Sequence, residues 1–180
     1  LDFATAHGIN FIDAAEMYPV PPKAETQGRT EEYLGSWLNR TGRRSEVVIA
    51  TKVIGPGLFP YIRGGPRLDR ASVLAACEGS LRRLKTDYID LYQSHADDPD
   101  TPFEDVLGTY QELIEQGKVR AVGASNISAV RLRQALDVSA RTGLVRYESL
   151  QPEYNLFDRE GYEAELEPLC REHGLGVITY

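Results

Sequence analysis

The sequence predicts an α/β fold, a (β/α)8 TIM barrel that is here incomplete, with strands two to seven and their helices. Strand-like apolar runs alternate with helical patterns in the order helix, five strand–helix units and one more strand. This order indicates parallel strands joined by right-handed crossovers. No G-x-G-x-x-G follows a strand, so the other common parallel fold lacks its fingerprint. Six strands at near-regular spacing therefore fit the barrel better.

Six strands are predicted from short apolar and β-branched runs between turn signals. The run Val47–Lys52 has few polar breaks, as expected of a strand buried on both faces. The other runs are shorter or mix apolar with polar residues. In chain order the predicted strands cover residues 11–13, 47–52, 88–93, 119–124, 147–151 and 175–180.

Helices are predicted between these strands from apolar residues three and four positions apart. The clearest start signal is Thr101-Pro102-Phe103-Glu104, which predicts a capping box with Thr101 as the N-cap and Pro102 at the first helical position. Glycines mark several of the predicted helix ends. In order, one helix ends at Gly8, others begin at Thr30 and near Asp69, one runs from the capping box to Gly117, and the last two cover residues 128–141 and 162–173.

Composition excludes several classes of protein. The chain has 180 residues, 42% of them hydrophobic, which is typical of a globular domain, and its formal net charge is −7. The negative charge argues against nucleic acid as a partner, and no apolar run is long enough to cross a membrane. The two cysteines predict neither a disulfide framework nor, with three scattered histidines, a metal site. We therefore expect a cytoplasmic protein without a metal.

Polar residues recur where the predicted strands end. Barrel enzymes place their active sites at the carboxyl ends of the strands. A polar residue is also the ordinary start of a loop, but an acid, a cation, an imidazole and amides at successive strand ends favour a site. These candidate residues are Asp13, Lys52, His95, Ser125, Asn126, Gln151 and Tyr180.

Tyr18 adds a candidate proton donor five residues after Asp13. A phenol has a pKa near 10 and is a poor acid at neutral pH unless a cation lowers that value. We expect Lys52 to be this cation, Asp13 to hold it charged, and His95 to donate a hydrogen bond to a substrate oxygen. Such a set can polarise a carbonyl group and protonate its oxygen. A Schiff base on Lys52 is the alternative, although Asp13 and Tyr18 suit a protonated lysine better.

Protonating a carbonyl oxygen requires a companion hydride, which no side chain supplies. A nicotinamide cofactor is the natural source. Ser125, Asn126 and Gln151 can hydrogen-bond its carboxamide, and Tyr180 offers a ring on which the nicotinamide can stack.

Six segments form a set of motifs that runs along almost the whole chain. They are Asp13-x4-Tyr18, Ala50-Thr51-Lys52, Asp87-Tyr88-Ile89-Asp90-Leu91-Tyr92-Gln93-x-His95, Gly123-Ala124-Ser125-Asn126, Gln151-Pro152-Glu153-Tyr154-Asn155 and Gly176-Val177-Ile178-Thr179-Tyr180. In this order they resemble the aldo-keto reductases. The loop Ala15-Glu16-Met17-Tyr18-Pro19-Val20-Pro21-Pro22, with Glu25-Thr26-Gln27-Gly28, is similar to a bacterial Tas-like NADP(H)-dependent branch and, more distantly, to potassium-channel β-subunits.

The resemblance implies a catalytic tetrad of Asp13, Tyr18, Lys52 and His95, with Tyr18 as the general acid. It implies that the remaining candidates hold the nicotinamide ring, that NADP(H) is preferred although NAD(H) stays possible, and that no metal is used. Ala96 departs from the family, in which an aromatic residue often follows the histidine. The family's first and eighth strands have no counterpart, so residues 1–180 are expected to be one barrel domain truncated at both ends.

The predicted function is NADP(H)-dependent reduction of an aldehyde or ketone to an alcohol. The alternative is a nicotinamide-binding regulatory or channel-associated subunit with weak catalysis. The partner is expected to be a small carbonyl substrate, with neither nucleic acid nor membrane insertion, and the sequence sets neither the substrate nor the oligomeric state.

Three further features carry expectations. Glu16 is predicted to be a solvated loop acid, with a second carboxylate near the site as the alternative. Residues 97–100 are predicted to be an exposed polar turn, with a cation site as the alternative. Residues 55–66 form a long insertion rich in glycine and proline on the predicted rim, for which substrate contact and disorder are both open.

Overall fold

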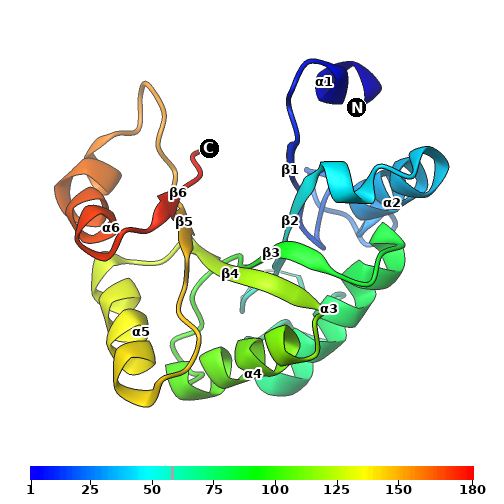
Figure 1. Cartoon of the computed structure of the whole chain (residues 1–180). Coiled ribbons are helices and arrows are strands. Elements are labelled where there is room, and N and C mark those ends of the chain that lie inside the picture. The colour runs from blue at the N-terminus through cyan, green and yellow to red at the C-terminus, as the bar shows by residue number, and fades with distance from the viewer. Residues whose placement is uncertain (58) are drawn as a thin grey trace.

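The computed structural model describes residues 1–57 and 59–180, and in them a curled sheet has helices on its convex side (Figure 1). All neighbouring strands are parallel and follow the chain order β1-β2-β3-β4-β5-β6. This is an incomplete (β/α)8 barrel, as predicted. The strands are β1 (Phe11–Asp13), β2 (Val48–Val53), β3 (Ile89–Ser94), β4 (Val119–Ser125), β5 (Ser149–Gln151) and β6 (Gly176–Val177).

Each connection between strands carries a helix, and Figure 1 shows these helices following one another around the outside of the sheet. Within the described residues, none of them is long and apolar enough to cross a membrane. The helices are α1 (Asp2–Ala6), α2 (Arg29–Thr41), α3 (Arg70–Leu84), α4 (Phe103–Glu115), α5 (Ala129–Thr142) and α6 (Glu167–His173), with a 3-10 turn at Arg44–Glu46 and a π turn at Tyr162–Leu166.

The strand register brings the candidate polar residues to one face of the sheet. Lys52 in β2 pairs with Gln93 in β3, which pairs with Gly123 in β4. Two residues further on, Ser125 pairs with Gln151 in β5. Since side chains alternate between the two faces of a strand, residues separated by two positions share a face. The carboxyl ends of the strands therefore present these side chains on one face at one edge of the sheet.

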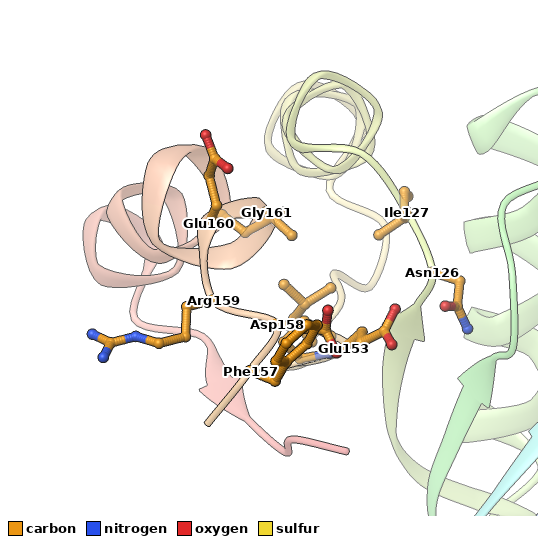
Figure 2. Close-up of a pocket in the computed structure, with 11 residues that line it drawn as sticks. Asn126, Ile127, Glu153, Phe157, Asp158, Arg159, Glu160 and Gly161 are labelled. Atoms are coloured by element: carbon orange, nitrogen blue, oxygen red, sulfur yellow. The ribbon is translucent and has the colours of Figure 1, made fainter. Parts of the chain in front are cut away.

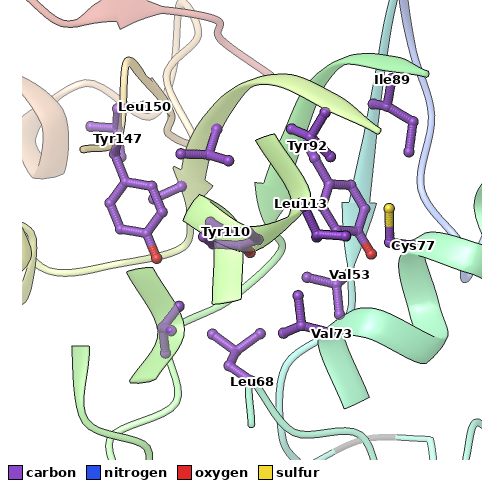
Figure 3. Packing of buried hydrophobic residues seen from close by; sticks show 14 of the residues in the cluster. Val53, Leu68, Val73, Cys77, Ile89, Tyr92, Tyr110, Leu113, Tyr147 and Leu150 are labelled. Carbon is purple, nitrogen blue, oxygen red and sulfur yellow. The ribbon is translucent and has the colours of Figure 1, made fainter. Parts of the chain in front are cut away.

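The layer between the sheet and its helices is closely packed and includes three buried tyrosines (Figure 3). Tyr92 and Tyr147 come from the sheet side, and Tyr110 comes from α4. The Ser94 hydroxyl lies 2.7 Å from the Tyr110 hydroxyl and 3.1 Å from that of Tyr147. Burying the Tyr110 and Tyr147 hydroxyls is tolerable because both are hydrogen-bonded to Ser94. The buried Tyr92 hydroxyl has no hydrogen-bond partner among the described residues. The shared hydrogen bonds join β3 to α4 and to the approach to β5.

The amino ends of the strands are held by a charged network. The Asp90 carboxylate accepts hydrogen bonds from the Ile49 backbone N–H at 2.9 Å and from Arg44 at 2.7 Å, and Arg120 donates to its other oxygen at 2.8 Å. Both guanidinium groups also lie over the Tyr88 ring, at 3.7 and 3.9 Å. This end of a barrel generally serves stability rather than chemistry.

The predicted capping box is wrong. Helix α4 begins at Phe103, and its N-cap is Pro102, whose ψ of 143° is extended rather than helical. The Thr101 hydroxyl does not cap the helix, because it donates instead to Asp98 Oδ2 at 2.8 Å.

The prediction of an exposed turn at residues 97–100 is wrong for Asp98, which is buried. Its carboxylate accepts from the Leu68 backbone N–H and from Arg67, both at 3.0 Å, as well as from Thr101. These bonds lower the pKa of Asp98 although burial alone would raise it. Asp98 thereby ties the segment before α3 to the loop after β3.

Two elements near the C-terminus differ from their predicted extents. The last strand is limited to Gly176–Val177, because only Ser149 and Leu150 of β5 pair with it. The predicted helix 162–173 contains a π turn before α6 begins at Glu167. Pro168 has no N–H to donate, which fits the change of helix type just before it.

Two helical glycines give a direct test of how the outer helices pack. A Cβ added to Gly35 in α2 would lie 2.1 Å from the Arg83 carbonyl oxygen at the end of α3. A Cβ added to Gly108 in α4 would meet nothing within 4 Å among the described residues. We expect Gly35→Ala to lower the free energy of unfolding by about 1–3 kcal/mol through overpacking. Gly108→Ala should raise it by up to about 1 kcal/mol through helix propensity.

Urea unfolding of both variants in the full-length protein measures this difference. Equal effects of the two substitutions would contradict the close approach of α2 to α3.

Candidate active site

All eight candidate residues lie along one rim of the sheet. Four of them occupy the last two positions of a strand, and two directly follow one. Tyr18 belongs to the loop after β1, and Tyr180 comes three residues after β6. The residues at strand ends are Asp13, Lys52, Ser125 and Gln151, and those just beyond are His95 and Asn126.

Lys52 is the centre of this arrangement. Its side chain is 0% exposed, and its ammonium group donates to Asp13 Oδ2 at 2.7 Å and to the Ala14 carbonyl oxygen at 2.8 Å. Burial lowers the pKa of Lys52, and the Asp13 carboxylate opposes that shift. A buried charge is stable only when it is paired and hydrogen-bonded. The two oxygen acceptors therefore hold Lys52 as a fixed ammonium group.

Tyr18 lies beside this ammonium group. The Lys52 Nζ atom is 5.2 Å from the centroid of the Tyr18 ring. The backbone at Tyr18 is fixed at both ends, since its N–H donates to Ala15 O at 3.0 Å and its carbonyl accepts from Gly28 N–H at 3.1 Å. The phenol is half-buried at the mouth of the rim.

The expectation that Lys52 lowers the pKa of Tyr18 is wrong in direction. Burial raises this pKa, and the negative charge of Asp13 and the proximity of Tyr180 add to the increase. Lys52 does not lower the pKa, because its ammonium group donates its hydrogen bonds to Asp13 and Ala14. It lies over the Tyr18 ring and donates no hydrogen bond to the Tyr18 hydroxyl. Tyr18 therefore stays protonated throughout the neutral range.

His95 completes the group. Its ring meets the Tyr18 ring edge-on, with centroids 5.9 Å apart and an angle of 81° between the planes. Burial, together with the positive charge of Lys52, lowers the pKa of His95 to about 4. The imidazole is therefore neutral at pH 7 and has one N–H to donate. Its Nδ1 atom is buried and has no hydrogen-bond partner among the described residues.

Ser125 and Asn126 are bound to their neighbours. The Ser125 hydroxyl donates to the Gln151 carbonyl oxygen at 2.7 Å. The Asn126 amide donates to His95 O at 2.8 Å and to Ser125 Oγ at 3.1 Å, and its oxygen accepts from the Tyr180 hydroxyl at 2.7 Å. Asn126 has a left-handed backbone with φ of 49°, which asparagine tolerates better than most residues. Both amide hydrogens of Asn126 are thus used within the protein.

The remaining cofactor candidates are more open. Tyr180 is 52% exposed, so its ring offers a surface for a planar ligand, and its hydroxyl fixes the ring to Asn126. The Gln151 amide makes no side-chain hydrogen bond within the described part of the chain, although the residue is 5% exposed. An open ring beside a spare amide suits a nicotinamide and its carboxamide. Ser125 and Asn126 fit a supporting role better than direct donation.

A cavity of about 440 Å³ lies next to this rim (Figure 2). It separates the β4–α5 connection, with Asn126 and Ile127, from the chain after β5, with Phe157 and Asp158. Asn126 is the candidate residue that lines it. The cavity therefore borders the site at Asn126 rather than at Lys52.

The titratable side chains of the described residues form no group of three or more that is placed to hold a metal ion. Both cysteines are buried and free, and burial raises the pKa of Cys77 to about 12.

Glu16 differs from the favoured sequence prediction. The expectation that it is a solvated loop acid is wrong, because its side chain is 1% exposed and accepts hydrogen bonds from Arg63 and from the Ile54 backbone. Two alanines precede it, and all three residues are buried. That apolar start of the loop was the available signal. No sequence signal indicated the position of Arg63, because the segment 55–66 has no hydrophobic periodicity.

Comparison with known proteins gives a consistent result. The model of the aldo/keto reductase family matches residues 1–180. The chain is 39% identical to Protein tas of Escherichia coli over all of its length, and 38% identical to the aldo-keto reductase str7 of Strobilurus tenacellus. It is 36% identical, over 97% of its length, to a probable voltage-gated potassium channel subunit beta of Arabidopsis thaliana.

The chain spans about half the length of these curated relatives, namely 57%, 48% and 50% in the same order. The family model covers every residue of the chain, including the whole rim described above. The chain therefore belongs to the aldo/keto reductase family of oxidoreductases.

Proposed function

We propose that this chain carries the catalytic site of an NADP(H)-dependent reductase that converts an aldehyde or ketone to an alcohol. The observation that carries the proposal is the contact sequence Asp13–Lys52–Tyr18–His95 at the carboxyl rim. Membership of the family supports the reaction class. NADP(H) is the cofactor we expect from the family, with NAD(H) as the alternative, and the cytoplasm is the location we expect.

The protein side chains in this proposal handle the substrate oxygen and its proton. Neutral His95 donates its N–H to the carbonyl oxygen and orients it. Tyr18 delivers its hydroxyl proton to the same oxygen as the carbonyl carbon becomes saturated. The raised pKa of Tyr18 keeps that proton available at neutral pH. The transfer is still favourable, because an alkoxide is a far stronger base than a phenolate.

Lys52 and Asp13 act on Tyr18. When Tyr18 loses its proton, the positive charge of Lys52 offsets part of the cost that burial and Asp13 impose on the phenolate, although the pKa of Tyr18 stays raised. Asp13 keeps Lys52 protonated and fixes its position through the 2.7 Å hydrogen bond. A Schiff base on Lys52 is disfavoured, since such a lysine must act as a neutral nucleophile and here its nitrogen is committed to two oxygens.

A bound nicotinamide supplies the hydride that carbonyl reduction requires. Tyr180 would support its ring and Gln151 its carboxamide, with Ser125 and Asn126 holding these two residues in place. The substrate is expected to be a small carbonyl compound.

A second candidate function follows from the relative named as a potassium channel subunit beta. In this alternative the chain belongs to a nicotinamide-binding regulatory subunit with weak catalysis. NADPH binding without NADPH oxidation across a panel of aldehydes, together with a stable protein partner, would favour it over the reductase.

The role of Tyr18 can be tested by Tyr18→Phe in the full-length protein. We expect kcat for aldehyde reduction to fall by roughly 10²- to 10⁴-fold, the usual contribution of a positioned acid. The Kd for NADPH should stay the same, because the ring is retained. Stopped-flow NADPH oxidation and fluorescence titration measure the two quantities.

The control for this variant is Tyr33→Phe, which removes the hydroxyl of an exposed tyrosine on α2. Wild-type turnover in Tyr18→Phe would contradict the proposed acid.

The lowered pKa of His95 predicts a pH dependence of stability. Its folded pKa of about 4 lies below the ordinary 6.5, so the unfolded state binds the proton more tightly. Stability therefore falls as pH decreases from 6.5 toward 4 and rises with pH across that window. We expect His95→Gln to flatten this part of the profile of unfolding free energy, measured by urea titration.

An NMR titration of the His95 imidazole gives a direct check in the folded protein. An imidazole that titrates near 6.5 would contradict the assignment of a neutral, desolvated ring.

A further inference from the structure

Glu16 is a buried carboxylate beside the rim that the proposed mechanism does not use. The Arg63 guanidinium binds both of its oxygens, with one bond of 2.7 Å from Nη2 to Oε1 and a second from Nη1 to Oε2. The Ile54 backbone N–H also donates to Oε1, at 2.8 Å. The Glu16 side chain is 1% exposed and that of Arg63 is 22% exposed. This two-pronged geometry is the strongest form of an arginine–carboxylate pair.

Glu16 is fixed to the chain on both sides of Val53. Its own N–H donates to the Lys52 carbonyl oxygen at 3.2 Å, while its side chain accepts from Ile54. Its carbonyl oxygen accepts from the Gln27 amide at 2.6 Å. Tyr18 follows two residues later, in a turn closed by its N–H to Ala15 O. The backbone that aims Tyr18 therefore begins at a residue locked to the end of β2, immediately after Lys52.

Arg63, which makes this contact, has an unusual backbone conformation. Its φ is 52°, in the left-handed region that side chains other than glycine, asparagine and aspartate seldom adopt. Such strain persists only where surrounding contacts impose it. The neighbouring Ile62 is buried and supplies an apolar anchor. The segment that carries Arg63 is therefore anchored by the buried Ile62 and by the ion pair with Glu16.

We propose that Glu16 and Arg63 form a positioning pair that holds the Tyr18 loop in register with Lys52 and His95. This inference rests on the proposed function, since the reaction is what the positioning serves. Neither residue touches the substrate in this scheme. Arg63 neutralises the buried carboxylate, and Glu16 transmits the fixed position to Tyr18 through two residues of backbone.

The test separates positioning from stability with variants of the full-length protein. Arg63→Met keeps the apolar stem but leaves the Glu16 charge unpaired. Glu16→Gln removes the charge and keeps an acceptor for Ile54. The double variant Glu16→Gln/Arg63→Met leaves no unpaired charge, and such replacements often restore or raise stability.

We expect Arg63→Met to lower kcat by about 10- to 100-fold, as small misplacements of reacting groups do. The Kd for NADPH should not change. The double variant should recover the Tm of the wild type while its kcat stays low, because no ion pair then fixes the side chain at position 16. Arg63→Lys keeps the charge without the planar fork, and should give an intermediate kcat.

A second readout does not depend on activity. Chymotrypsin cleaves after Tyr61, which is exposed two residues before Arg63. Cleavage at Tyr61 should be faster in Arg63→Met and in the double variant than in the wild type, because the segment is no longer attached to Glu16.

The matched control is Arg44→Met at the amino ends of the strands. There Asp90 likewise accepts from a backbone N–H of β2 and from Arg44, and in addition from Arg120. The Arg44 and Asp90 side chains are 16% and 11% exposed. This variant should lower Tm and leave kcat and cleavage at Tyr61 unchanged.

The outcomes distinguish the two proposals. If none of the aldehydes tested supports NADPH oxidation by the wild-type protein, the proposed function is contradicted, and this inference with it. If the wild type is active, the inference alone is overturned by an unchanged kcat in Arg63→Met, by a double variant whose kcat recovers with its Tm, by an equal loss of kcat in Arg44→Met, or by unchanged cleavage at Tyr61.

Discussion

The buried ammonium group of Lys52 is the interaction on which the rest of the site depends. It is fully removed from solvent and is held by the Asp13 carboxylate and the Ala14 carbonyl oxygen. Both acceptors come from the end of β1 and the residue after it, so a single charge joins β1 to β2 exactly where the Tyr18 loop begins. The same charge contributes to the lowered pKa of His95. One buried cation on β2 thus orders an acid and a phenol from the β1 strand–loop unit and an imidazole from the β3 unit.

At both ends of β2 a carboxylate accepts hydrogen bonds from an arginine and from a backbone N–H, but the two carboxylates have different roles. At the amino end, Asp90 accepts from Ile49 and from arginines, in a network that joins strands. At the carboxyl end, Glu16 accepts from Ile54 and from Arg63, but it also begins the loop that carries Tyr18. A carboxylate that satisfies a strand-end N–H and an arginine is stabilising in both places. The difference lies in what is attached to it, which is why only the carboxyl end is expected to affect turnover.

The parallel strand order and the position of the rim followed from the sequence, because the strands alternate with helices and polar residues recur where they end. The pairing of Lys52 with Asp13 also followed, but the rest of the residue-level electrostatics did not. The direction of the Tyr18 pKa depends on which atoms receive the Lys52 hydrogen bonds, and the burial of Glu16 depends on Arg63, 47 positions away. The prediction of Thr101 as the N-cap of α4 was wrong for the same reason, since the Thr101 hydroxyl donates to Asp98 instead. Local patterns predict elements, but long-range partners decide how a polar side chain is used.

Isotope transfer tests the central claim most directly, namely that this rim carries out carbonyl reduction. The full-length protein is incubated with an aldehyde and NADPH that carries deuterium at both C4 positions of the nicotinamide, and the alcohol is analysed by mass spectrometry. The account predicts one deuterium on the former carbonyl carbon, and a large loss of this product in Lys52→Met. Alcohol formed without deuterium, or formed equally fast by Lys52→Met, would contradict it.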